Sequence, residues 1–270
     1  MGDISYKPLI QDMRWSFSRI ESFDSCKWKW FLHYIREWEE DDLFYNSYGS
    51  LIHEIIQLYY TGKLKKEQMP LYFLKNFSER VSGERPAEST VQKYISAGLN
   101  YTRNFKPFDL NCVGVEKKIE FSIDGIQFVG FIDFLGEKDN EFYIIDHKSR
   151  ELKQRSKKLQ KTSKDKELDE MLKQLYLYSA GIKQEFGKYP KKLCFNCFRN
   201  SEFIEEDFDK KKYDETIQWA VDTIHRIEDT EDFEPNQDPF KCRWLCGLSD
   251  RCEYNLEAIE EWKRNKLHEG

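Results

Sequence analysis

The chain has 270 residues, of which 39% are hydrophobic and 34% charged, and its formal net charge is −6 at pH 7. No apolar run approaches the roughly 20 residues that a membrane helix needs, and the first ten residues lack the apolar core of a signal peptide. These features predict a cytoplasmic protein without a membrane segment, and the acidity disfavours a general nucleic-acid binder.

Four helices are predicted in the first part of the chain. Apolar residues recur at helical spacing over residues 14–36, 48–62, 65–82 and 89–105. Ser16 or Ser18 can cap the first helix, and Glu21 completes a capping box with Ser18. Cys26 lies inside this helix.

Gly49 and His53 stand four residues apart and therefore share one face of the second helix. Gly49 would let another backbone approach closely, and His53 lies one turn further on. A single histidine on an apolar helix is more often a packed core residue than a metal ligand, so this pair alone does not define a site.

Strands follow the helices. A hairpin is predicted from strands at 112–122 and 126–135, with Asp124-Gly125 as its tight turn. Gly130 to Arg150 reads as two short strands rich in Phe, Ile and Tyr, joined by a polar turn. A helix over 167–186, a strand over 191–200 and a helix over 209–229 complete the pattern.

Each strand of the second hairpin carries one carboxylate among apolar residues, Asp133 in the first and Asp146 in the second. A two-residue or four-residue loop centred on Asp139-Asn140 places these carboxylates directly opposite each other, whereas an odd loop places them on opposite faces. Two facing carboxylates cost desolvation free energy, which a divalent metal would offset. A buried Asp–Lys ion pair in an ordinary sheet is the alternative.

The same register places Phe131 opposite Lys148. Because strand side chains alternate, Lys148 points to the same face as Asp146, and His147 points to the other. Glu116 in the preceding strand could face the same site, but a solvated or cross-strand-paired carboxylate is the simpler interpretation.

Nine lysines and arginines, but only two acidic residues, lie between Lys148 and Lys166. The segment is too polar and irregular to pack, so a solvated, mobile surface loop is its simplest interpretation. A contact with the DNA backbone that does not read sequence is the functional interpretation. The candidate DNA-binding residues are Arg150, Lys153, Arg155, Lys157, Lys158 and Lys161.

Seven cysteines in a cytoplasmic protein favour metal or redox use over disulfides. Three of them fall within eleven residues, namely Cys242, Cys246 and Cys252. Such a triplet is typical of a metal site and needs a fourth ligand, for which Cys26 is the best candidate, although a disulfide or a structural role is the alternative. Cys194 and Cys197 point to opposite faces of a strand and are predicted to be buried small residues.

Together these residues resemble the RecB-type branch of the PD-(D/E)XK nuclease superfamily, over nearly the whole chain. The matching fragments, in family order, are SFSRIESFDSC with Cys26, the GxxxH motif Gly49–His53, the motif Gly130–Asp133, the D/E-x-K motif Asp146–Lys148, the QxxxY motif Gln174–Tyr178 and the C-terminal cysteine triplet. AddB nuclease modules and CRISPR-associated iron–sulfur exonucleases are the most similar in style. This chain departs from the family in its three residues between Cys242 and Cys246, where two are usual, and in Lys27 after the first cysteine.

The resemblance implies an α/β (α+β) restriction-endonuclease-like fold, with a mixed sheet flanked by helices, an N-terminal helical region and a C-terminal cysteine loop. It implies one nuclease domain over residues 1–270, with a helical subregion at 37–106 and an iron–sulfur subregion formed by 237–270 with Cys26. It also implies Mg²⁺ or Mn²⁺ as the catalytic cofactor and a [4Fe–4S] cluster, with zinc as the alternative at the cysteines.

The resemblance assigns a role to each residue. The metal ligands it implies are His53, Asp133, Asp146 and the backbone carbonyl of His147. The catalytic residues it implies are Asp133, Asp146, Lys148, Gln174 and Tyr178. The cluster ligands it implies are Cys26, Cys242, Cys246 and Cys252.

The function implied is that of a metal-dependent DNA exonuclease acting on DNA ends or single strands in recombination, repair or CRISPR adaptation. No GxxxxGK[ST] sequence occurs, so any helicase is expected to be a separate partner. The alternative is a nucleic-acid-binding subunit of a larger complex with incidental cleavage, which the net acidity and the missing motor leave open. A non-catalytic interaction module stabilised by metal is a third possibility, which the His–Asp–Asp–Lys set disfavours.

Overall fold

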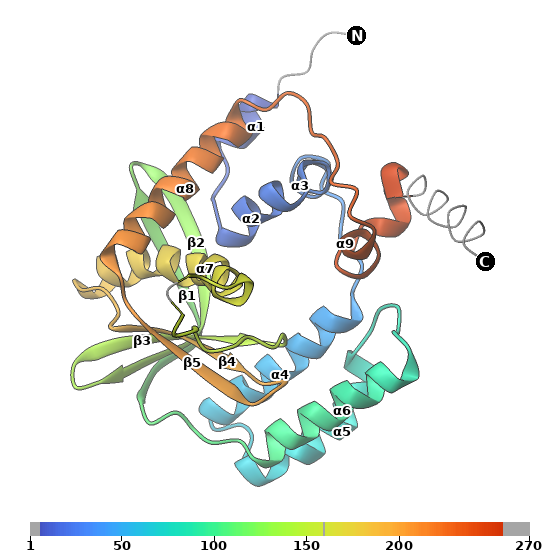
Figure 1. Cartoon of the computed structure of the whole chain (residues 1–270), viewed down its shortest axis with the longest axis vertical. Helices are drawn as coiled ribbons and strands as arrows, with labels where there is room; N and C mark the ends of the chain where they lie inside the picture. Colours follow the sequence, from blue (N-terminus) through green and yellow to red (C-terminus); the bar gives the residue numbers. More distant parts are fainter. Residues whose placement is uncertain (1–5, 159, 256–270) are drawn as a thin grey trace. The chain divides into compact units, whose positions relative to one another are not determined.

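The computed structural model describes residues 6–158 and 160–255 and divides into two units (Figure 1). One unit is continuous and runs from Phe44 to Val221. The other combines residues 1–43 with residues 222–270, of which 6–43 and 222–255 are described.

The continuous unit is built on a five-stranded sheet with the order β1-β2-β3-β4-β5. Its strands are β1 (Asn111–Ile123), β2 (Ile126–Lys138), β3 (Glu141–Lys148), β4 (Lys192–Cys197) and β5 (Glu202–Asp207). All neighbours are antiparallel except β3 and β4, which are parallel. A parallel pair needs a crossover connection, and helix α7 (Ser163–Phe186) supplies it.

Two tight turns fix the register of the first three strands. Asp124 and Gly125 join β1 to β2, and Asp139 and Asn140 join β2 to β3; all four have positive φ, as two-residue hairpin turns require. The predicted even turn is therefore confirmed. The paired residues of β2 and β3 end at Phe134 and Ile145, one step before the two carboxylates would meet, and Phe131 and Lys148 are not paired.

Strand β1 changes face in its middle. Val115 packs against the apolar cluster around Phe134, whereas Lys117, two residues later, reaches Glu185 of α7. In a regular strand these two residues would share a face. Glu116 between them has φ 48°, a left-handed conformation that non-glycine residues rarely adopt. The side chains of β1 therefore change from one face of the sheet to the other at Glu116. This residue also lies in the candidate site.

Three helices pack together in this unit: α4 (Phe44–Tyr60), α5 (Met69–Arg80) and α6 (Glu88–Arg103) (Figure 1). Their core is rich in aromatic side chains, including fully buried Tyr48 and Phe73. Gly98 lies against Phe73, where an added Cβ would come within 2.3 Å of the ring, so this contact needs glycine. Gly49 behaves differently from the prediction, because a Cβ there would make only ordinary 3.8 Å contacts with the Ser149 side chain.

Helix α7 lies against the part of the sheet formed by β1 and β2. It begins four residues before the predicted start because Thr162 and Asp165 form a capping box. The ring of Tyr178 fills the space above Gly130, where a Cβ would lie 2.5 Å from the ring. This close approach joins α7 to the strand that carries Asp133.

The discontinuous unit is helical in its described residues. It contains α1 (Lys7–Gln11), α2 (Phe17–Ser25), α3 (Lys27–Tyr34), α9 (Pro239–Trp244) and the 3₁₀ turn η2 (Ser249–Arg251), and the division between the units falls within α8 (Lys210–Glu228).

The prediction of one helix over 14–36 is wrong, because the backbone of Cys26 is extended (φ −162°, ψ 108°) and separates α2 from α3. Ser16 caps α2 by accepting the Arg19 N–H, which confirms one of the two predicted caps. Cys26 itself caps α3, since its Sγ accepts the Lys29 N–H at 3.4 Å. The break holds the thiol at a helix start.

The predicted fold class is confirmed as a mixed sheet flanked by helices. Edge strand β5 was not predicted. The predicted cysteine subregion over 237–270 is described as far as residue 255, and its last part lies outside the described residues. None of the described helices combines the length and the apolar character that crossing a membrane would take.

Candidate active site

His53, Glu116 and Asp133 form the centre of the candidate site. Nδ1 of His53 lies 3.7 Å from Glu116 Oε1 and 3.6 Å from Asp133 Oδ2. One ligand atom from each residue lies within 4.8 Å of the other two, and no other such group of three His, Cys, Asp or Glu residues occurs in the described part of the chain. Nitrogen and carboxylate oxygens are suitable ligands for a divalent cation.

The backbone of His147 fixes the orientation of His53. Nε2 of His53 lies 2.9 Å from the carbonyl oxygen of His147. Because a carbonyl only accepts, Nε2 carries the hydrogen, and in the neutral ring the lone pair of Nδ1 faces the two carboxylates. Metal-binding histidines commonly donate their second N–H to a backbone carbonyl in this way. The His147 carbonyl, predicted as a metal ligand, thus already accepts from His53 and has one further lone pair.

Asp133 is held by the same backbone. Its Oδ2 accepts the N–H of His147 at 2.6 Å, which takes the place of the next ladder hydrogen bond between β2 and β3. Burial and the nearby Asp146 raise the pKa of Asp133 to about 7, although His53 opposes the shift. Burial alone would lower the pKa of His53, but Glu116, Asp133 and Asp146 outweigh it, and the pKa is raised. The raised pKa of Asp133 indicates that this buried carboxylate lacks a sufficient counter-charge.

Asp146 and Lys148 lie beside this centre. Lys148 Nζ is 2.8 Å from Asp146 Oδ2 and donates a 3.0 Å hydrogen bond to Gln174 Oε1. Gln174 Nε2 in turn lies 3.4 Å from the hydroxyl of Tyr178. Burial raises the pKa of Tyr178 to about 12, so the phenol stays neutral. The structure thus joins Asp146, Lys148, Gln174 and Tyr178 in one chain of contacts, as the resemblance implied for the D/E-x-K and QxxxY motifs.

One polar atom in this chain of contacts is incompletely paired. Asp146 Oδ2 is buried, and among the described residues it has no hydrogen bond, because the ion pair with Lys148 lies outside hydrogen-bond geometry. Three carboxylates, from Glu116, Asp133 and Asp146, therefore converge with a single ammonium group. This donor set fits a divalent cation, which would supply the missing positive charge.

Glu116 is the site residue that the sequence interpretation underestimated. The pairs Val115–Phe134 and Lys117–Ile132 flank it, and this register places Glu116 opposite Asp133. The Asp124-Gly125 turn, which the sequence does predict, sets the same register. Counting the same number of residues along both strands from this turn brings Glu116 opposite Asp133. This count is the sequence signal that could have identified Glu116 as a site residue.

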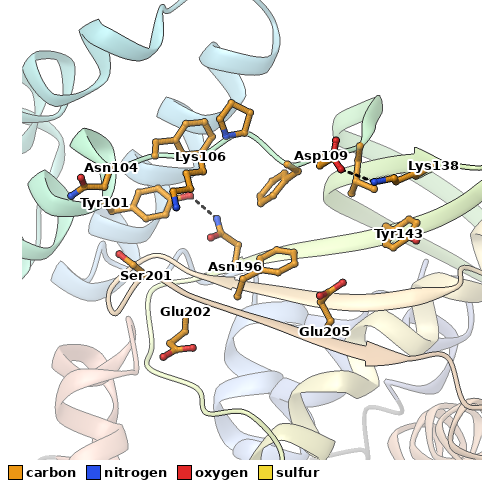
Figure 2. A pocket seen from close by; sticks show the side chains of 15 residues that line it. Tyr101, Asn104, Lys106, Asp109, Lys138, Tyr143, Asn196, Ser201, Glu202 and Glu205 are labelled. Carbon is orange, nitrogen blue, oxygen red and sulfur yellow. Dashed lines mark hydrogen bonds and ion pairs between the residues drawn. The ribbon is translucent and has the colours of Figure 1, made fainter.

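The ring of His147 points away from Asp146, as predicted. Its Nδ1 lies 3.2 Å from Asn196 Nδ2, which also donates to the hydroxyl of Tyr101 at 2.7 Å. Figure 2 shows Asn196 and Tyr101 at the wall of a cavity of about 620 Å³ that also borders Phe203 and Glu205. None of the predicted catalytic residues lines this cavity.

A second cavity does border the metal-site residues. It has a volume of about 670 Å³. Its lining residues are Tyr45, Asn46, Gly49, Ser50, His53, Glu54, Gln57, Glu116, Phe131 and Ser149. We refer to this cavity as the substrate groove.

The basic segment is more anchored than predicted. Leu152 is buried, and Arg155 pairs with Asp169 at 2.8 Å and with Glu206 at 2.9 Å, so the prediction that the segment does not pack is wrong at these positions. Arg150 and Lys161 also have carboxylate partners, Glu167 and Asp169 respectively. Within the described residues, Lys153, Lys157 and Lys158 have none.

The four predicted cluster cysteines converge in the discontinuous unit. Cys26, Cys242, Cys246 and Cys252 all line one small cavity. Burial raises the pKa of the Cys242 thiol, and the other three sulfurs add to the shift. Cys194 and Cys197 are buried on β4, as predicted, and lie outside this cavity.

Comparisons with known proteins agree with this geometry. The family model of the PD-(D/E)XK nuclease superfamily matches residues 14–253. The chain therefore belongs to the PD-(D/E)XK nuclease superfamily. A search of curated protein sequences finds no match.

Several solved structures match this chain, among them the following two. One, from Eubacterium rectale and provisionally named an exonuclease, is 13% identical with a TM-score of 0.52, and the match covers 87% of this chain and 88% of that one. At this identity the match supports the fold alone. The other, named SSO0001, is 15% identical over 88% of this chain and 95% of that one, and its TM-score of 0.32 carries no argument.

Proposed function

We propose that this nuclease-superfamily protein is a divalent-metal-dependent DNA exonuclease. The observation that carries the proposal is the convergence of His53, Glu116 and Asp133 within 4.8 Å, beside the Asp146–Lys148 pair. The match to a nuclease family supports hydrolysis of phosphodiester bonds as the reaction.

His53, Glu116, Asp133 and Asp146 would hold Mg²⁺ or Mn²⁺, with the carbonyl of His147 as a further oxygen donor. The imidazole favours Mn²⁺ relative to a site made only of oxygen atoms. When bound, the cation supplies Lewis-acid stabilisation of the scissile phosphate and a nucleophilic water at neutral pH.

Lys148 places a fixed positive charge beside this centre. Gln174 accepts one of its N–H groups and so orients the ammonium, which leaves its other donors for the phosphate or the attacking water. Tyr178 holds Gln174 in turn, and the two act as positioning residues.

We further propose that the four cysteines hold a [4Fe–4S] cluster, as in the RecB-type, AddB-like branch of the superfamily. Their convergence on one cavity supports a shared metal centre. Four sulfurs bound to one zinc ion at about 2.3 Å lie roughly 3.8 Å apart. In the described residues no three of these thiols lie within 4.8 Å of one another. Zinc is the alternative.

The substrate we propose is DNA at ends or in single strands, with a separate helicase or a recombination or CRISPR-adaptation protein as partner. Lys153, Lys157 and Lys158 are available for phosphates, since no carboxylate in the described residues pairs with them. Arg150, Arg155 and Lys161 have protein partners that DNA would have to displace.

The proposal is tested with the variants Asp146→Asn and Lys148→Ala. Both should abolish cleavage of labelled DNA in Mn²⁺ while circular dichroism shows an unchanged fold, because the first removes a metal ligand and the second removes the charge beside it. Lys148→Ala should still bind Mn²⁺ in calorimetry. Full activity of either folded variant would reject the assignment.

A further inference from the structure

Phe131 is exposed at the edge of the substrate groove. Its side chain is 52% exposed, although it lies on a central strand two residues before Asp133. The groove brings it together with His53 and Glu116 of the metal site. A single exposed apolar side chain is ordinary on a protein surface, but Phe131 lines the groove that also borders two candidate metal ligands, so any substrate lying in that groove would meet its ring.

The backbone of Phe131 is held within the sheet, next to the candidate catalytic residues. Phe131 pairs with Lys118 of β1, and the ring of Tyr178 packs over the adjacent Gly130. Tyr178 also contacts Gln174, which orients Lys148. The backbone that carries the ring is therefore fixed relative to the candidate lysine and Asp133.

The rest of the groove offers little to a phosphate backbone. Its lining includes no lysine or arginine among the described residues. Its two acidic residues are Glu116, in the metal site, and Glu54, which pairs with Arg80. The remaining polar groups are amides and hydroxyls, such as Asn46, Gln57 and Ser149. Aromatic and amide groups suit the faces and edges of nucleobases.

We propose that Phe131 stacks on an unpaired nucleobase next to the scissile phosphate and makes the site selective for single-stranded DNA. Every base offers a face for stacking, so the contact tolerates any sequence. In a duplex both faces of an internal base are already stacked, and Phe131 could reach one only after the strand opens. This inference rests on the proposed nuclease function.

The test compares wild type with Phe131→Ala and Phe131→Trp on three labelled ligands: a dT oligonucleotide, an abasic strand of equal length and a blunt duplex. Affinity is measured by anisotropy in EDTA, so that cleavage is not needed. Phe203→Ala is the matched control, because Phe203 is also an exposed aromatic of the continuous unit but lies outside the groove.

Phe131→Ala should bind the dT strand about tenfold more weakly than wild type and the abasic strand equally well. Phe131→Trp should keep the preference of wild type for the dT strand over the abasic strand. The fluorescence of the added tryptophan should be quenched by dT but not by the abasic strand. An equal loss on both strands, or no loss on either, would overturn the proposal. Cleavage in Mn²⁺ is scored separately, so a wild type that binds dT through Phe131 but cleaves nothing would reject the nuclease function alone.

Discussion

His147 has two roles in the structure, one through its backbone and one through its ring. Its N–H binds Asp133 and its carbonyl binds His53, while its ring nitrogen contacts Asn196 on the other side of β3. Burial and the positive charges of His53 and Lys148 hold the pKa of the His147 ring well below its usual value, so the ring stays neutral. A neutral, fixed ring keeps the backbone groups in place for the candidate metal ligands.

At the residue scale, Glu116→Gln should weaken metal binding. The amide keeps the shape of the side chain but removes one of the negative charges that face the cation. We expect a loss of affinity for Mn²⁺ of about tenfold or more, measured by calorimetry at pH 8. Glu120→Gln is the control, because Glu120 lies on the same strand and its partner is the exposed Lys118. An unchanged affinity in Glu116→Gln would exclude Glu116 from the site.

Sequence reasoning placed the candidate residues of β2 and β3 because strand alternation and turn parity are short-range rules. They placed Asp146 and Lys148 together and His147 on the other face. They did not predict that Asp133 takes the N–H of His147, or that His53 binds the same residue's carbonyl. The first contact replaces a ladder hydrogen bond inside the hairpin, which the strand pattern does not reveal. The second depends on where α4 lies against the sheet, a tertiary arrangement without a local signal.

At the scale of elements, the basic segment is fastened to α7 by Asp169. This carboxylate contacts Arg155 and Lys161 of the segment, both at 2.8 Å, and Lys212 of α8 at 3.2 Å. Burial alone would raise the pKa of Asp169, but these three cations lower it from 3.8 to about 2. The network explains why a segment with so many charges packs, a result that charge counting alone could not predict.

Asp169→Asn should therefore lower the free energy of unfolding by roughly 1 to 2 kcal/mol at pH 7, because each unit of pKa shift corresponds to about 1.4 kcal/mol and solvent screens part of the effect. The carboxylate's folded pKa is depressed, so its contribution is present above about pH 4 and is lost as the pH falls through about 2. The destabilisation should shrink between pH 7 and pH 3 in urea unfolding. Glu170→Gln, at an exposed neighbour, should change stability little at either pH. A destabilisation that does not vary with pH would contradict the charge explanation.

Lys157 and Lys158 of this segment, which pair with no carboxylate of the described residues, give a prediction about DNA. Changing both to glutamine should reduce the salt dependence of single-strand affinity by roughly 1.4 log units per log unit of salt, at about 0.7 for each phosphate that is no longer neutralised. Affinity should be measured between 50 and 200 mM salt, a range of about fourfold. The double change of Lys210 and Lys211 to glutamine, on α8, is the control. An unchanged salt dependence would show that these lysines do not contact phosphates and that the segment is only a solvated surface.

At the scale of the whole molecule, the cysteine site connects residues from both ends of the chain. Cys26 Sγ accepts the N–H of Asn236, and Cys242 contacts the carbonyl of the same residue. The sequence predicted the participation of Cys26 from its motif, but not the helix break that exposes its sulfur, because the apolar spacing continues across the break.

Protein purified under anaerobic conditions should be brown and contain about four irons per chain. Cys26→Ser should lose most of the iron and lower the melting temperature, because metal bound to the folded form adds to its stability. Cys112→Ser, at an exposed thiol of β1, should do neither. Colourless protein with stoichiometric zinc would show that the cysteines bind zinc and not an iron–sulfur cluster. Full iron retention in Cys26→Ser would exclude Cys26 as a ligand.

The division of the chain into two units also determines which unit is completed first during synthesis. The continuous unit, Phe44 to Val221, is complete on the ribosome before Cys242 has been made. At about 5 to 20 residues per second, Cys26 waits on the order of 10 to 40 seconds for its partners. Cys26 is the first of the four cysteines to be synthesised, but the four thiols can come together only after the last of them, Cys252, has been made. A metal shared by the four cysteines, as proposed, could therefore bind only at the end of synthesis, when the strands that carry Asp133 and Asp146 can already have folded.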